Sequence, residues 1–397
     1  MAFDRARVQD VEVAGRTALV RVDFNVPLAA GEVTDDTRIR AALPTIQLLL
    51  DRGAAVILAS HLGRPDGNPD PALSLEPVAR RLAELLDRPV AFCPEATGEE
   101  AVRMADALEP GEVMLLENLR FDPGETDNDP AFARALASLA DLYVDDAFGA
   151  AHRAHASTEG VPGLLPSSGG LLLQEEVERL SAVADDPERP LIVVLGGAKV
   201  SDKIGLISRF LEIADEILIG GAMCFPFFRA QGIETGDSLV EEEGISLAAD
   251  LIASAEAPDT RAELVLPVDI AAGESFDAGA ERVELDSDSV PEGMLGLDIG
   301  EKTAADYAAR IGGAGTVFWN GPMGAFELPG FSLGTRIVAD AVASTDGLTV
   351  VGGGDSVAAL VEFGLTDSIN WVSTGGGASL ELLEGIPLPG IEALDGG

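Results

Sequence analysis

The chain has 397 residues, of which 47% are hydrophobic, and 68 acidic against 26 basic residues give it a formal net charge of −42. This length and this apolar content predict two globular domains with large cores, and they exclude a disordered chain. The charge argues against a nucleic-acid partner, whose phosphates a protein must neutralise, and the apolar runs are too short for a membrane span.

Apolar, strand-like runs alternate with helical stretches along the chain, a pattern typical of parallel α/β sheets. The strands expected in chain order are 18–22, 54–59, 113–116, 142–144, 191–195, 216–219, 264–266, 316–319, 349–351 and 371–373. Between the fourth and the fifth, Leu171–Val183 is expected to form an amphipathic helix that connects two domains. We therefore predict an α/β fold of two doubly wound, Rossmann-like parallel-sheet domains joined by a hinge helix, with bounds at 1–172 and 173–385.

Polar and basic residues follow the strands of the first half. Because open parallel sheets bind ligands beyond the carboxyl ends of their strands, these residues predict a binding site there. They are Asp23-Phe24-Asn25, His61-Leu62-Gly63-Arg64, Asn118-Leu119-Arg120 and His152-Arg153-Ala154-His155.

Five arginines lie near these strand ends or in adjoining loops: Arg21, Arg38, Arg64, Arg120 and Arg153. Arginine binds phosphate and carboxylate with two parallel hydrogen bonds, so several together favour a small, multiply anionic substrate. Any one of them alone is better explained as a surface ion pair. The aspartate and asparagine after the first strand suit substrate hydroxyls or a turn, and the two histidines three residues apart suit a shared helical face or a structural role.

The second half holds two of only three lysines in one glycine-rich turn, at Lys199 and Lys203. A lysine ammonium is a compact point charge, which suits a moving anion. Two further glycine-rich turns, 352–356 and 374–378, follow strands and open helices, where main-chain N–H groups bind anions. Asp355 is a candidate Mg²⁺ ligand. A single glycine triplet would be explained by a tight turn, but two triplets and the lysine turn favour phosphate binding.

At these residues the chain resembles the phosphoglycerate kinase family essentially end to end. The matching segments are Arg21–Pro27, His61–Pro65, His152–His155, Gly196–Lys203, Trp319–Glu327, Gly352–Ser356 and Ser373–Gly385. The resemblance implies an N-terminal domain for 3-phosphoglycerate, a C-terminal domain for ATP or ADP with Mg²⁺, and a tail, 386–397, that returns to the first domain. It implies reversible phosphoryl transfer from 1,3-bisphosphoglycerate to ADP, in glycolysis and gluconeogenesis.

The resemblance also implies roles for single residues. Phosphoglycerate would be bound by Asp23, Phe24, Asn25, Arg38, His61, Leu62, Gly63, Arg64, Arg120 and Arg153. Nucleotide would be bound by Lys203, Gly296, Asn320, Glu327, Gly353, Gly354, Asp355 and Ser356, with Asp355 on the metal. The phosphoryl group in transfer would be stabilised by Arg38, Lys199, Gly376 and Gly377. Ser356 stands where a threonine is common, and Cys224-Phe225-Pro226 interrupts an expected helix start.

Phosphoryl transfer needs positioning and charge stabilisation more than covalent help. We expect closure of the two domains at hinges in 171–183 and 374–384, because closure excludes water from the acyl phosphate. Two alternatives stay open: a two-domain kinase acting on another small phosphorylated carboxylate, and a nucleotide-binding or anion-binding module without turnover.

The cellular setting is also an expectation. Two cysteines without metal-ligand spacing suggest reduced thiols in a cytoplasmic protein, and the resemblance implies a monomer. The acidic surplus suggests a halophilic protein adapted to multimolar salt, where charges are screened within about 3 Å at 1 M.

Overall fold

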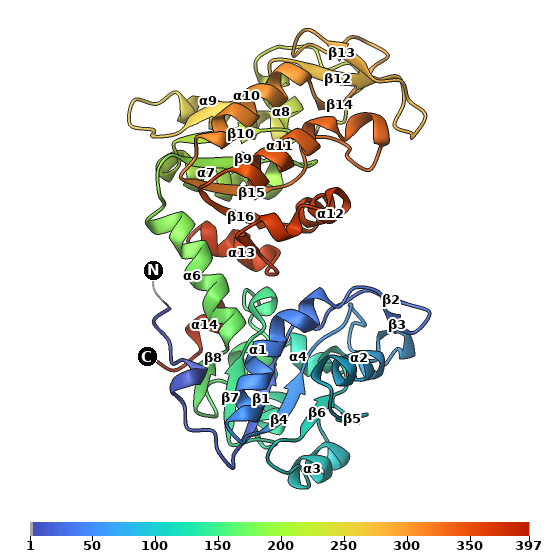
Figure 1. The fold of residues 1–397 in the computed structure, drawn as a ribbon, viewed down its shortest axis with the longest axis vertical. Coiled ribbons are helices and arrows are strands. Elements are labelled where there is room, and N and C mark those ends of the chain that lie inside the picture. The colour runs from blue at the N-terminus through green and yellow to red at the C-terminus, as the bar shows by residue number, and fades with distance from the viewer. Residues whose placement is uncertain (1–2, 397) are drawn as a thin grey trace. The chain divides into compact units, whose positions relative to one another are not determined.

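The structure is a computed structural model that describes residues 3–396. Contacts divide the chain into two compact units (Figure 1). The first comprises the N-terminal residues through Glu178 together with the segment from Ile386 onward, and the second comprises Arg179–Gly385. The division falls inside helix α6 (Leu171–Asp185), slightly later in the chain than the bounds expected at 172 and 173.

The first unit contains a six-stranded sheet in the order β5-β6-β4-β1-β7-β8, and every neighbouring pair is parallel. Its strands are β1 (Thr17–Arg21), β4 (Ala55–Ala59), β5 (Val90–Cys93), β6 (Val113–Leu116), β7 (Leu142–Asp145) and β8 (Ser167–Gly169). Its helices are α1 (Thr37–Asp51), α2 (Glu76–Leu86), α3 (Glu99–Asp106), α4 (Pro123–Thr126), α5 (Pro130–Ala137) and α14 (Pro389–Glu392). Strands β2 (Leu28–Ala29) and β3 (Glu32–Val33) form a hairpin.

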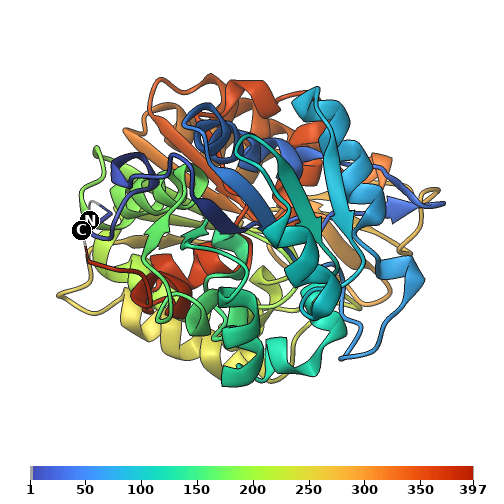
Figure 2. The ribbon, with the colours of Figure 1, turned by 90° about the horizontal axis from the view of Figure 1, so that it is seen from below.

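The central strands of this sheet are buried on both faces, as expected where helices cover both sides of a parallel sheet. Figure 2 shows the blue-to-teal strands of the sheet side by side between helices. The C-terminal segment belongs to this unit: Ala6 N donates to Asp395 O at 2.9 Å, and Ser167 N donates to Asp395 Oδ2 at 2.8 Å.

The second unit also contains a six-stranded parallel sheet, in the order β11-β10-β9-β15-β16-β17. Its strands are β9 (Leu191–Leu195), β10 (Glu216–Ile219), β11 (Glu263–Val265), β15 (Thr316–Asn320), β16 (Leu348–Gly352) and β17 (Trp371–Val372). Its helices are α7 (Ile204–Ile213), α8 (Cys224–Ala230), α9 (Gly244–Ala255), α10 (Glu301–Gly312), α11 (Leu333–Ser344), α12 (Gly354–Phe363) and α13 (Gly377–Leu383). A small antiparallel sheet, which we did not predict, joins β12 (Ile270–Gly273), β13 (Val283–Leu285) and β14 (Leu295–Ile299).

The strand order of the second unit reverses between β9 and β15, the two central strands. Ligands bind at such switch points, beyond the carboxyl ends of the strands. The lysine turn follows β9 and Asn320 ends β15, so both lie at this position. The prediction of two Rossmann-like parallel-sheet domains is confirmed. Within residues 3–396 no helix is long and apolar enough to span a membrane.

Candidate functional site

The first unit gathers polar groups at the carboxyl ends of three neighbouring strands, β1, β4 and β6. Asp23 and Asn25 follow β1, His61 follows β4 and Arg120 follows β6. Asn25 Oδ1 accepts a 3.0 Å hydrogen bond from Gly63 N, and Arg120 Nη1 donates to Gly63 O at 2.8 Å. The residues predicted from three separate segments are thus hydrogen-bonded to one another.

Arg38 reaches this cluster from the first turn of α1. Its Nη1 donates to Asp23 Oδ2 at 2.8 Å, while about a third of its side chain, 34%, stays exposed. Asp23 Oδ1 in turn accepts from Asn25 N at 3.2 Å. Arg38 is therefore anchored on one side and open to solvent on the other, as a residue that binds an incoming anion must be.

The cluster is strongly electropositive. Burial, followed by the charge of Arg21, lowers the pKa of Arg120 to about 10. Burial and the neighbouring arginines lower the pKa of His155 to about 4 and that of His61 well below its usual value. Because the charged forms of these groups repel one another, the cluster would be stabilised by a bound anion.

Arg64 and Arg153 are exposed, and neither side chain has a hydrogen bond or an ion pair with residues 3–396. In a chain with so many carboxylates, a cation left unpaired is available for a ligand. The charge of Arg153 acts on Arg120 and on His155, which places it at the cluster. His152 and His155 do not share a helical face, because residues 152–155 form no helix.

The lysine turn of the second unit is held by main-chain contacts. Lys203 Nζ donates to Gly196 O at 2.6 Å and to Asn320 O at 2.7 Å, and burial lowers its pKa to about 8. Lys199 is exposed. Glu241, which we did not predict, holds the turn in shape by accepting from Val200 N at 2.9 Å and from Ser201 N at 3.1 Å.

The two lysines line a cavity of about 280 Å³ together with the glycine turn that opens α12. Gly353 has φ +90°, and a Cβ there would lie 2.7 Å from Asn320 Nδ2, so only glycine fits. Asp355 is exposed in the first turn of α12, whereas the Ser356 hydroxyl is buried and accepts from Gly321 N at 2.5 Å. Ser356 therefore shapes the cavity wall through an internal bond.

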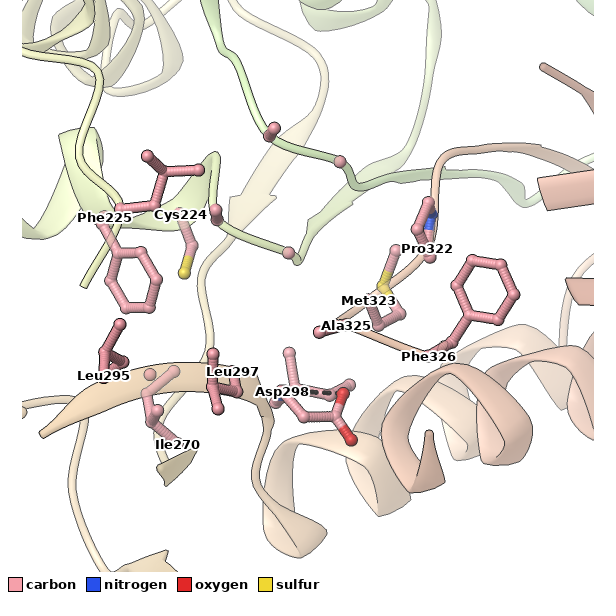
Figure 3. Close-up of a pocket in the computed structure, with 18 of the residues that line it drawn as sticks. Cys224, Phe225, Ile270, Leu295, Leu297, Asp298, Pro322, Met323, Ala325 and Phe326 are labelled. Carbon is pink, nitrogen blue, oxygen red and sulfur yellow. Dashed lines mark hydrogen bonds between the residues drawn. The ribbon is translucent and has the colours of Figure 1, made fainter. Parts of the chain in front are cut away.

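A second, apolar cavity of about 450 Å³ shares Gly197, Ala198 and Asp355 with the first. Figure 3 shows Phe225, Ile270 and Leu295 on one side of it, and Met323 and Phe326 on the other. Gly296 allows the Phe225 ring to pack closely against the main chain of its wall, because a Cβ at Gly296 would strike that ring. The exposed carboxylate of Glu327 is part of the lining.

The Cys224-Phe225-Pro226 segment does not interrupt helix α8, which begins at Cys224. Pro226 lies in the first turn, where the missing N–H has no intrahelical partner to lose. Gly376 and Gly377, at the start of α13, line neither cavity among the described residues. No group of three or more His, Cys, Asp or Glu side chains in residues 3–396 is arranged to hold a metal ion.

Comparison with known proteins decides the family. The family model described as phosphoglycerate kinase matches residues 8–386. The phosphoglycerate kinase of Moorella thermoacetica is 55% identical over 387 residues, 98% of this chain and 98% of that one. The chain belongs to the phosphoglycerate kinase family.

Other relatives agree. The phosphoglycerate kinase of Rubrobacter xylanophilus is 54% identical over 392 residues, 99% of this chain and 98% of that protein. The solved phosphoglycerate kinase structure from Coxiella burnetii has a TM-score of 0.88 at 40% identity and covers 98% of each chain. The predicted activity is confirmed: the enzyme is a kinase of glycolysis that acts on small-molecule substrates.

The apolar cavity of this phosphoglycerate kinase could not be predicted from the sequence. Its walls come from α8, from the small sheet and from the loop after β15, segments that are far apart in the chain. Phe225, Ile270 and Leu297 are apolar residues in apolar surroundings, so nothing in the pattern separates them from core residues. Gly296 was predicted only through the resemblance.

Proposed function

We propose that the first unit of this enzyme binds 3-phosphoglycerate and the second unit binds MgATP, and that the two exchange a phosphoryl group reversibly. One observation supports this assignment above the others. The cationic cluster at the strand ends of the first unit suits a small polyanion. In the second unit the apolar cavity adjoins the cavity lined by lysines and glycines, and the two together suit the base and the phosphates of a nucleotide.

The phosphoglycerate would be bound by residues of complementary kinds. Arg38, Arg64, Arg120 and Arg153 provide cationic donors for its phosphate and carboxylate, and Asp23 and Asn25 provide oxygens for its hydroxyl. Because Arg64 and Arg153 have no ion pair with residues 3–396, the ligand would not have to displace a carboxylate from them. His61, Leu62 and Gly63, which follow β4, belong to the same cluster.

The nucleotide would place its base in the apolar cavity and its phosphates in the adjoining one. Glu327 is the lining group suited to ribose hydroxyls, and Lys203 and the main-chain N–H groups at Gly353 and Gly354 suit the phosphates. Asn320 shapes the cavity by donating from Nδ2 to Gly352 O at 2.9 Å.

Mg²⁺ fits this site as an ion carried by the nucleotide. Asp355 is an exposed carboxylate beside the phosphate cavity, and Mg²⁺ commonly takes one or two protein carboxylates together with phosphates and water. When bound, the ion would neutralise phosphate charge as the phosphoryl group moves. We propose Asp355 as its protein ligand.

The transfer itself would be assisted by Arg38 and Lys199, two cations that solvent can reach, and by the amides of Gly376 and Gly377. For the amides only the resemblance supports the role. The acceptor is a carboxylate, so no general base is required. Closure of the two units around both substrates remains a prediction, and small-angle scattering with and without both substrates tests it.

A coupled assay with 3-phosphoglycerate and MgATP tests the proposal as a whole. We expect turnover with 3-phosphoglycerate and none when another small phosphorylated carboxylate replaces it. Binding of both ligands without turnover would instead favour an anion-binding module. We further propose a role in gluconeogenesis, a monomeric state, a cytoplasmic location and adaptation to high salt. Sedimentation would test the monomeric state, cell fractionation the location, and melting in increasing KCl the adaptation to salt.

A further inference from the structure

A fully buried arginine contacts the cluster at the strand ends of the first unit, where no substrate can reach it. Arg21 is the last residue of β1, and its relative exposure is 0%. Burying a guanidinium is costly unless its donors are satisfied. The surroundings of Arg21 supply an acceptor for each of its three nitrogens.

The first two nitrogens of Arg21 bind the protein framework. Nε donates to Ser157 Oγ at 2.8 Å, and Nη1 donates to Val22 O at 2.5 Å. Ser157 is itself fixed by Glu125, which accepts from its hydroxyl at 2.6 Å and from its main-chain N at 3.0 Å. Tyr143 also donates to Ser157 O at 2.7 Å. The guanidinium therefore has one orientation.

The third nitrogen of Arg21 meets the ring of His61. Nη2 lies 3.2 Å from His61 Nδ1, and Glu125 Oε1 is 3.9 Å from the same Nη2. A guanidinium has donors only, so the histidine nitrogen must be the acceptor. A neutral imidazole whose Nδ1 accepts carries its proton on Nε2.

The surroundings of His61 favour this neutral ring. Burial disfavours a positive charge on it most, followed by the charges of Arg21, Arg120 and Arg38, and together they lower its pKa. The contact with Arg21 is the only hydrogen bond of the His61 ring among the described residues, so Nε2 has no partner there. An anionic ligand needs a donor at this atom, and the alternative tautomer would present a lone pair instead.

We propose that Arg21 is a positioning residue: by donating to Nδ1 it fixes His61 as the tautomer with its proton on Nε2, leaving an N–H donor for phosphoglycerate. The inference rests on the proposed function for the identity of the ligand. Glu125 and Ser157 support this role, because they hold the guanidinium in the orientation in which it donates to His61.

The test uses the full chain labelled with ¹⁵N in its histidines, of which there are only three. Long-range ¹H–¹⁵N spectra show which ring nitrogen carries a proton, and His61→Gln assigns the signals. We expect an unprotonated Nδ1 and a protonated Nε2 in His61 from pH 6 to pH 8. A proton on Nδ1, or exchange between two tautomers, would overturn the proposal.

The Arg21→Met variant adds a kinetic readout. It should populate the other tautomer and lower kcat/KM for 3-phosphoglycerate about tenfold or more, as expected for a lost hydrogen bond to a charged ligand, with KM for MgATP unchanged. The matched control is Arg134→Met, an exposed arginine of the same unit, which should leave spectrum and kinetics as they are. An Arg21→Met spectrum identical to the wild type would also overturn the proposal.

Two outcomes separate this inference from the proposed function. If 3-phosphoglycerate leaves the His61 Nε2 signal unmoved, then His61 does not bind the substrate, although Arg21 still fixes its tautomer. If Arg21→Met does not fold, the wild-type spectrum still decides, because a proton on Nδ1 contradicts the proposed hydrogen bond.

Discussion

Lys203 is bound to Asn320 by a hydrogen bond of 2.7 Å from the lysine Nζ to the main-chain carbonyl. The bond links the turn after β9 to the end of β15, the two strands between which the strand order reverses. Within residues 3–396 no carboxylate forms an ion pair with this lysine, and burial lowers its pKa to about 8. The lysine charge is thus held by carbonyl dipoles and is available to an anion.

The affinity for ADP should therefore fall above about pH 8. In the proposed site the nucleotide phosphates bind the protonated form of Lys203, so each pH unit above the pKa of Lys203 should weaken binding by up to about tenfold. Calorimetry between pH 7 and pH 9.5 measures this. Lys203→Arg should hold its affinity over the same range, because arginine stays protonated. Lys302→Arg, at an exposed lysine paired with Asp286, should follow the wild type; a wild-type affinity independent of pH would contradict the assignment.

Gly353→Ala should abolish measurable ADP binding and lower stability by about 1–3 kcal/mol, because a non-glycine residue at φ +90° is strained and its Cβ would strike Asn320 Nδ2. Gly364→Ala is the matched control. Gly364 also has a positive φ, +71°, but nothing lies within 4 Å of the place that a Cβ would take there. The control should lose stability by about 1 kcal/mol and bind ADP normally. Equal ADP affinities in both variants would remove Gly353 from the phosphate site.

The sequence predicted the central strands well and the rest of the sheets less well. Leu191–Leu195 and Val113–Leu116 match their strands to the residue, because each is a short apolar run buried on both faces. Strand β8 (Ser167–Gly169) was missed, because Ser-Ser-Gly has no strand preference of its own and becomes a strand only by pairing with β7. Its structure depends on pairing with a strand elsewhere in the fold, and the local sequence pattern holds no information about that pairing.

The candidate site divides in the same way. Rare residues marked the lysine turn and the histidine motifs, and one of the two glycine triplets, 352–354, marked the cavity beside the lysines. The buried support of the site was not predictable: Glu125 and Glu241 are two among 68 acidic residues, and only their hydrogen bonds to Ser157 and Ser201 distinguish them. Such partners are brought together by the fold rather than by spacing in the chain.

Arg38→Ala and Lys199→Ala should each lower kcat by about a hundredfold or more while the Kd for ADP changes little, because charges that act in the transition state contribute mainly to turnover. Steady-state kinetics and calorimetry measure the two quantities. The matched control for the arginine is Arg40→Ala, on the same helix and paired with Asp36, and that for the lysine is Lys302→Ala. A variant that keeps its wild-type kcat would lose its place in the mechanism.

Asp146→Asn should remove part of the pH dependence of stability. Asp146 Oδ1 accepts from Leu172 N at 2.9 Å at the start of α6, but Oδ2 is buried without a partner, and burial raises the pKa to about 7. The pKa of an aspartate in the unfolded chain is 3.8, so between pH 3.8 and about 7 the folded protein keeps a proton that the unfolded chain has released. The stabilisation that this proton gives the folded state is therefore lost as the pH rises toward 7.

Urea unfolding at pH 5 and at pH 8 measures that loss. We expect it to be smaller in Asp146→Asn by on the order of 1–3 kcal/mol, because an amide does not ionise. Asp106→Asn, at an exposed aspartate of the same unit, should lose as much stability as the wild type between the two pH values. The same loss in Asp146→Asn would mean that this carboxyl ionises normally when folded.

Stability should rise steeply with KCl concentration. A net charge of −42 on 397 residues disfavours the compact state, because the carboxylates repel one another. Most of the few basic side chains are already paired with neighbouring carboxylates, for example Arg40, Arg81 and Arg261. Added salt shortens the screening length from about 10 Å at 0.1 M to about 3 Å at 1 M, which relieves repulsion between surface carboxylates. Melting temperatures in 0.1 to 3 M KCl measure the effect, with sucrose as the control, because it is excluded from the surface but screens no charge. If the melting temperature did not change with KCl, or if sucrose raised it equally, the acidic surplus would not make folding depend on salt.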